Sequence, residues 1–288
     1  MIPGAFTYHR PGSVAEAVAL LATHGDEARP ISGGHSLIPM MKLRMAGPEH
    51  LVDLAGIAEL KGICEQDGTI IIGAMTTQHD LIHSDLLAQK LPIIAETSTV
   101  IADPQIRYLG TIGGNVANGD PGNDMPALMQ CLNASYVLSG PEGDREVAAR
   151  DFYEGAFFTA LAEDELLTAI KIPAPPAGHG YAYEKLKRKV GDYATAAAAV
   201  ILVMEGGRAT HCSVALTNVG DTPLYAAEAS DILTGSSLDA ETIKRAIAAA
   251  EAITDPAEDG RGPAEYRTKM AGVMVERALA RAASIASA

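Results

Sequence analysis

Two short stretches, Ser32-Gly33-Gly34-His35-Ser36 and Thr111-Ile112-Gly113-Gly114-Asn115, each place a pair of glycines among small polar residues. Paired glycines permit positive φ angles and lack the Cβ atom that would keep a ligand away from the backbone. Successive N–H groups can then point into one concavity and bind a phosphate group. We therefore predict that both stretches are loops that bind a phosphate-containing ligand.

The alternative interpretation of each stretch is a tight turn that binds no ligand. The two stretches lie far apart in the sequence, so joint binding requires that folding bring them together. The chain contains no G-x-G-x-x-G and no G-x-x-x-x-G-K-[ST] sequence. This absence excludes the usual Rossmann and P-loop routes to a bound nucleotide.

The order of helix, strand and turn signals around the two stretches predicts an α+β protein with three segments. Ser13 and Glu16 form a capping box that starts a helix ending near His24, before Gly25. A linker rich in proline is expected at 173–178. The predicted domains are 1–55 (α/β), 56–176 (α+β) and 177–288 (an antiparallel sheet with helices). The predicted strands are 29–31, 50–54, 69–74, 134–139, 166–172, 181–187, 196–205 and 209–218, with Gly206-Gly207 as a hairpin turn; the predicted helices are 13–24, 38–43, 76–88, 91–100, 226–233, 240–252 and 267–286; and 103–126 is expected to be irregular.

Composition narrows the classes of function. The chain has 22 Lys and Arg against 36 Asp and Glu, a net charge of −14, so it lacks the cationic field of a nucleic-acid-binding protein. Its 3 cysteines form no C-x-x-C pair, which argues against a thiolate zinc site or an iron–sulfur cluster in this chain. Residues 1–10 lack the apolar core of a secretory signal, and no apolar run is long enough to span a bilayer. We expect a cytoplasmic protein.

Catalytic residues are not predicted. No nucleophile, triad or acid–base pair stands out, and no metal ligands are expected. Asp120 and Asp124 lie in an oxygen-rich stretch that lacks the later glutamate of an EF-hand, so we expect them to cap turns, with Asp124 available to a ribose hydroxyl. His35 has no second histidine at ligand spacing and is expected to shape its loop or contact the ligand. The basic run Lys185, Lys187, Arg188 and Lys189 is expected to be a solvated face or a docking patch.

The two glycine-pair motifs and the spacing between them resemble the FAD-binding fold of the vanillyl-alcohol-oxidase (PCMH) type. Within that fold, the chain resembles the FAD-binding medium subunits of molybdenum hydroxylases, the family of xanthine dehydrogenase. The runs 101–108, 119–126 and 183–189, the last followed by Gly191-Asp192-Tyr193, are similar to the medium subunits of aerobic carbon monoxide dehydrogenases. The resemblance covers the whole chain. The one departure is Ser32 in place of a common alanine, which removes no hydrogen-bond donor.

This resemblance implies a flavoprotein subunit whose FAD lies between the first two domains. Residues 32–36 and 111–115 would hold the diphosphate, Asp124 would lie near the adenosine half, and Tyr193 would cover one face of the isoalloxazine ring. The partners implied are a small subunit with two [2Fe–2S] clusters and a large subunit with molybdopterin cytosine dinucleotide and a Mo–Cu centre, in a dimer of heterotrimers. Electrons from carbon monoxide would pass through the clusters and FAD to a quinone-type acceptor, at the inner face of the cytoplasmic membrane.

Three alternatives stay open at this point. The complex could instead act on an aldehyde, on nicotine or on an aromatic substrate. The chain could be a flavin oxidoreductase that acts without partners, which would need an ionisable pair beside the ring. It could also be a scaffold protein that uses the glycine pairs only as turns.

Overall fold

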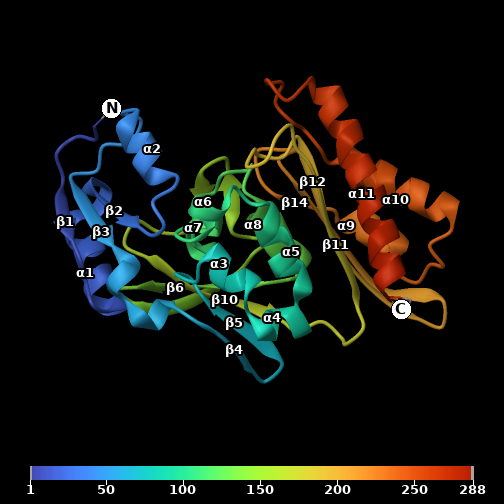
Figure 1. Ribbon diagram of the computed structural model, residues 1–288, viewed down its shortest axis with the longest axis horizontal. Coiled ribbons are helices and arrows are strands. Elements are labelled where there is room, and N and C mark those ends of the chain that lie inside the picture. The colour runs from blue at the N-terminus through green and yellow to red at the C-terminus, as the bar shows by residue number, and fades with distance from the viewer. Residues whose placement is uncertain (1, 287–288) are drawn as a thin grey trace.

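A parallel three-stranded sheet forms the N-terminal part of the chain, in the order β1-β3-β2 (Figure 1). The structure is a computed structural model that describes residues 2–286. The Ser13 side chain accepts a hydrogen bond from the Glu16 amide, as predicted, whereas the Glu16 carboxylate accepts from Gly12, one residue before the N-cap. The elements are β1 (Thr7–His9), α1 (Val14–His24), η1 (Gly25–Glu27), β2 (Ala28–Ile31), α2 (Leu37–Lys42), β3 (His50–Asp53), η2 (Leu54–Gly56) and η3 (Ala58–Leu60).

An antiparallel five-stranded sheet, in the order β4-β5-β10-β6-β7, forms the middle part. Six helices accompany it, and Figure 1 shows most of them gathered on one side of the sheet. Their apolar side chains and those of the sheet form one buried core. The elements are β4 (Ile63–Gln66), β5 (Thr69–Gly73), α3 (Gln78–Ile82), α4 (Asp85–Lys90), α5 (Pro92–Val100), α6 (Pro104–Arg107), α7 (Ile112–Ala117), α8 (Asp124–Cys131), β6 (Ser135–Gly140), β7 (Gly143–Ala148), β8 (Tyr153–Gly155), β9 (Phe158–Thr159) and β10 (Leu166–Pro173).

Local capping explains where this part departs from the prediction. The helix expected over 76–88 is two helices, because Ser84 caps a new helix, α4, with its side chain. The expected irregular stretch 103–126 contains α6 and α7 and the start of α8. Asp103 caps α6 and is followed by Pro104, a residue well suited to the first helical position. Strands β4, β7, β8 and β9 were not predicted.

The C-terminal sheet, in the order β11-β12-β13-β14, is buried on both faces. On β12, Ala197, Ala199 and Ile201 belong to the core shared with the middle part, whereas Ala198 and Val200 pack toward the C-terminal helices. This double burial explains the continuous apolar run of β12, since strands covered on both faces do not alternate with polar residues. The elements are β11 (Gly180–Leu186), β12 (Ala196–Glu205), β13 (Arg208–Thr217), β14 (Leu224–Tyr225), α9 (Ala227–Leu233), α10 (Ala240–Ala252) and α11 (Ala264–Ala286).

Several predictions are confirmed by these elements. Helices and strands are mixed, as an α+β protein requires. The hairpin turn between β12 and β13 has positive φ at both Gly206 and Gly207. Each predicted segment holds one main sheet, although the domain boundaries themselves stay predictions. Within residues 2–286, no helix is both long and apolar enough to cross a membrane.

Candidate functional site

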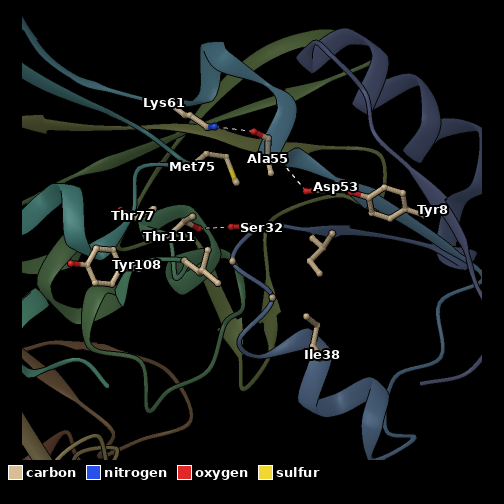
Figure 2. Close-up of a pocket in the computed structure, with 14 residues that line it drawn as sticks. Tyr8, Ser32, Ile38, Asp53, Ala55, Lys61, Met75, Thr77, Tyr108 and Thr111 are labelled. Atoms are coloured by element: carbon tan, nitrogen blue, oxygen red, sulfur yellow. Dashed lines mark hydrogen bonds between the residues drawn. The ribbon is translucent and has the colours of Figure 1, made fainter. Parts of the chain in front are cut away.

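A cavity of about 360 Å³ lies between the N-terminal parallel sheet and the loop that precedes α7 (Figure 2). It borders the carboxyl ends of β2 and β3, the edge where open α/β sheets bind their ligands. Both predicted glycine motifs reach the cavity, through Ser32, Gly33 and Gly34 from the first and Thr111 from the second. The rest of the wall includes Tyr8, Asp53, Lys61, Thr77 and Tyr108.

The two motifs meet directly. The Ser32 and Thr111 side-chain oxygens, 79 residues apart in sequence, form a hydrogen bond, drawn as a dashed line in Figure 2. A Cβ on Gly33 would lie 2.3 Å from the Leu109 carbonyl oxygen, and one on Gly114 would lie 3.0 Å from the Ser32 Oγ. The convergence that joint binding requires is therefore present, and glycine at these positions allows the close approach.

The first motif offers free backbone donors. Gly34 has a φ of +73°, which only glycine adopts readily. Within residues 2–286, no acceptor is found for the N–H groups of Gly33, Gly34, His35 or Ser36. Ser36 precedes α2, and its side chain makes no capping hydrogen bond. A turn with several adjacent N–H groups lacking a protein partner fits a phosphate group.

The second motif is helical, and the backbone N–H groups of Ile112, Gly113, Gly114 and Asn115 already have protein acceptors. Thr111 caps α7 by accepting from the Gly114 amide at 3.1 Å. The Ile112 and Gly113 amides donate to the Thr76 and Ala74 carbonyls, both at 2.9 Å. The prediction that residues 111–115 form a loop was wrong, because 112–117 is helix α7. The glycines are needed instead because a Cβ on Gly113 would lie 2.6 Å from the Ala74 oxygen.

Side chains of the second motif point in other directions as well. Ile112 is fully buried in the core of the middle part. The Asn115 side-chain oxygen accepts from the Met125 amide, and the Asn115 carbonyl accepts from Asn123. The motif therefore contributes Thr111 to the wall of the cavity. Its predicted contact with the FAD diphosphate stays a prediction.

Asp124 is not free to bind a ribose here. It is buried in α8, where one carboxylate oxygen accepts from the Tyr183 hydroxyl at 2.6 Å and the other pairs with the Lys185 ammonium at 2.8 Å. Burial, with the Asp124 charge, raises the pKa of Tyr183 well above its ordinary value. Lys185 was expected on a solvated face, and this was wrong, because its side chain is only 3 % exposed.

Tyr193 lies away from the cavity, on the loop between β11 and β12. A Cβ on Gly122 would lie 2.8 Å from its ring, so the ring packs on the turn that contains Asp120. Although 41 % of Tyr193 is exposed, desolvation of the phenol and the nearby Asp120 carboxylate raise its pKa to about 12. Tyr193 therefore stays an uncharged phenol at neutral pH. Its predicted contact with the flavin ring stays a prediction, as does that of the exposed His35.

Sequence reasoning missed the polar wall formed by the ends of β1 and β3. The Tyr8 hydroxyl donates to the Asp53 carboxylate, which also accepts from the Ala55 amide at 2.9 Å, and the Lys61 ammonium donates to the Ala55 carbonyl at 2.8 Å. The hydrogen bond to Asp53, together with burial, raises the pKa of Tyr8. A signal was available, because Asp53 falls near the end of a predicted strand, but the sequence does not show which strands run parallel.

Two family models match the chain, one over the N-terminal and middle parts and the other over the C-terminal part. Residues 4–175 match the model of the FAD binding domain in molybdopterin dehydrogenase, and residues 181–282 match that of the CO dehydrogenase flavoprotein C-terminal domain. The chain belongs to this family of FAD-binding molybdopterin dehydrogenase subunits. The resemblance deduced from the glycine motifs is thereby confirmed, and FAD is the cofactor.

Individual relatives match this flavoprotein chain over nearly its whole length. The carbon monoxide dehydrogenase medium chain of Afipia carboxidovorans is 69 % identical over 98 % of each chain. That of Hydrogenophaga pseudoflava is 51 % identical over 97 % of each. The crystal structure of a Cu,Mo-CO dehydrogenase in its cyanide-inactivated form superimposes with a TM-score of 0.98 at 68 % identity, covering 99 % of this chain and 100 % of the other.

The residues of the cavity fit part of an FAD molecule. The free N–H groups of the Ser32–Ser36 turn suit a diphosphate, since backbone amides bind phosphate oxygens without a large cationic patch. Lys61 adds a cation at the same wall. Glycine at position 33 lets this turn pack against the Leu109–Gly110 backbone, and glycine at position 34 permits the positive φ that shapes the turn.

Replacing Thr111 with valine should weaken both α7 and FAD binding. Valine has nearly the same shape but removes the N-cap acceptor and the bond to Ser32. We expect the free energy of unfolding to fall by about 1 kcal/mol, the usual cost of a lost cap, and FAD to dissociate more readily. Urea denaturation and flavin fluorescence titration measure the two effects. Thr111→Ser keeps the hydroxyl and should behave like the original chain; equal losses in both variants would contradict this role.

Proposed function

We propose that the chain is the FAD-binding electron-transfer subunit of a carbon monoxide dehydrogenase, which converts CO + H2O to CO2 + 2H+ + 2e−. The observation that carries this proposal is the high identity to carbon monoxide dehydrogenase medium chains over almost the full length of both partners. The segments 1–55 and 56–176 would enclose FAD, and 177–288 would complete the subunit.

The chain's own residues would bind and orient the cofactor. The amides of the Ser32–Ser36 turn would hold the diphosphate, Ser32 and Thr111 would keep the two walls together, and Tyr193 would cover the flavin ring. When bound, FAD supplies the redox chemistry, since flavins exchange electrons singly or in pairs. The carboxylate of Asp53 is occupied by Tyr8 and Ala55, so the described residues of the cavity wall include no carboxylate that is free to act as a base.

The cysteines support an external source of electrons. Cys131 and Cys212 are buried, and burial raises the pKa of Cys131 to about 12. Cys64 is exposed and does not line the cavity. Iron–sulfur clusters need several thiolates close together, so the clusters would belong to a small partner subunit. The molybdenum centre would belong to a large one, in a dimer of heterotrimers that reduces a quinone-type acceptor at the inner face of the cytoplasmic membrane.

The proposal is tested by anaerobic absorption spectroscopy of the chain co-produced with its small and large partner subunits. We expect flavin bands that bleach when carbon monoxide is added. As a control, the chain alone with FAD should not respond, because the electrons must come from the partners.

Other outcomes separate the alternatives. Bands that ignore carbon monoxide but bleach with an aldehyde, nicotine or an aromatic substrate would assign the subunit to another molybdenum hydroxylase. Turnover by the chain alone would make it an independent flavin oxidoreductase. A complex without any flavin would leave the glycine pairs with a purely structural role.

A further inference from the structure

Three histidines from separate elements meet on the N-terminal sheet, outside the cavity. His9, His24 and His50 each offer one ring nitrogen, and these nitrogens lie within 4.8 Å of one another. The His9 Nε2 is 2.9 Å from the His50 Nδ1. Within residues 2–286, no other group of three or more histidine, cysteine or acidic side chains brings its ligand atoms this close. All three are half-buried, so the cluster is accessible to ions from solvent.

The topology of the sheet explains the meeting. Thr7 of β1 pairs with His50 of β3 in parallel register, so His9, two residues on, projects from the same face as His50. Val52, also on that face, packs in the core with α1. His24 is the last residue of α1, and its ring stacks on that of His50 at 3.6 Å between centroids. Figure 1 shows α1 beside β1 and β3.

The chemistry of the cluster suits a transition-metal ion. Three ring nitrogens, one from each histidine, already lie within 4.8 Å of one another. Neutral imidazole is a preferred ligand of Zn²⁺, whereas Ca²⁺ and Mg²⁺ need oxygen ligands, and the cluster has none.

We propose that His9, His24 and His50 bind one divalent transition-metal ion of the zinc type, with water as a fourth ligand. Zn–N bonds of about 2.0–2.1 Å place tetrahedral ligand nitrogens about 3.3 Å apart. The nitrogens lie within 4.8 Å of one another, so a shift of up to about 1.5 Å brings them to that spacing, with His24 rotating off its stack on His50. The bound ion would join β1, α1 and β3. His50 begins β3 and Asp53 ends it, so the ion would lie at the opposite end of the strand from the cavity wall.

The test uses the full-length chain, purified without partner subunits and stripped with a chelator, so that no partner metal contributes. Equilibrium dialysis with Zn²⁺ should find one tight site, and Co²⁺ in its place should give the intense visible absorption of tetrahedral coordination. His24→Ala should weaken Zn²⁺ binding by at least about tenfold, because one of three nitrogen ligands is lost. Zn²⁺ should also raise the thermal midpoint of the original chain but not of this variant.

Two control variants locate the ion. His211→Ala removes an exposed histidine of β13 and should leave Zn²⁺ binding unchanged. His83→Ala breaks a separate histidine pair at α3, His79–His83, whose rings are 4.2 Å apart, and should also leave Zn²⁺ binding unchanged. Circular dichroism of His24→Ala checks that it is folded, with His24→Gln as the substitute if it is not. The proposal is overturned if Zn²⁺ binds the original chain no tighter than the His24 variant, or if only His83→Ala abolishes binding.

Discussion

Replacing Gly33 with alanine should yield a chain that is purified almost without flavin. The added Cβ would lie 2.3 Å from the Leu109 oxygen and 2.7 Å from the Gly110 Cα, closer than real Cβ contacts allow. Both neighbours are backbone atoms, so they cannot rotate away, and the turn that carries the free amides must move. Hydrogen bonds to a charged group contribute about 1.5–3 kcal/mol each, so misplacing even one lowers FAD affinity by about 10- to 150-fold.

Gly47→Ala is the matched control. Among the described residues, 2–286, none would have an atom within 4 Å of a Cβ added at Gly47, and the φ of Gly47 is not positive, so alanine fits there without strain. The ratio of flavin absorbance to protein in the purified variants, followed by FAD titration, measures the difference. A Gly33→Ala chain that keeps stoichiometric FAD would show that this turn does not hold the cofactor.

Replacing Lys185 with methionine should lower the free energy of unfolding by about 3–5 kcal/mol, because it leaves the Asp124 carboxylate buried and unpaired. The side chains of Lys185 and Asp124 are 3 % and 5 % exposed. The pair also joins α8 to β11, so its loss loosens the contact between the middle and C-terminal parts. The shift in the urea denaturation midpoint measures the effect.

Two further variants make this prediction specific. Adding Asp124→Asn to Lys185→Met should recover much of the lost stability, since the amide is uncharged and can still accept from Tyr183. Lys171→Met breaks an ion pair with Glu146 that is largely exposed, 38 % and 47 %, and should cost less than about 1 kcal/mol. Equal effects of Lys171→Met and Lys185→Met would contradict the buried-pair interpretation.

The sequence by itself determined the family, the cofactor and most of the secondary structure. Ser13 and Gly25 mark the two ends of α1 through their own backbone and side-chain preferences, and Gly206-Gly207 marks a hairpin in the same way. The glycine pairs carry the resemblance to FAD-binding subunits because they keep Cβ atoms away from backbone and ligand. These signals are local, so they can be read along the chain.

Only the tertiary structure decided which residues that are far apart in the sequence contact one another. The composition of the Thr111 motif predicts a loop, yet the motif is helical, and its glycines allow close contacts with Ala74 and Ser32 rather than a turn. Asp124 was expected at a ribose and instead neutralises Lys185. The meeting of Ser32 with Thr111 and the histidine cluster likewise join residues from separate elements. Such pairings depend on strand order and helix packing, which arise from burial of the whole core and leave no mark in the spacing of the residues involved.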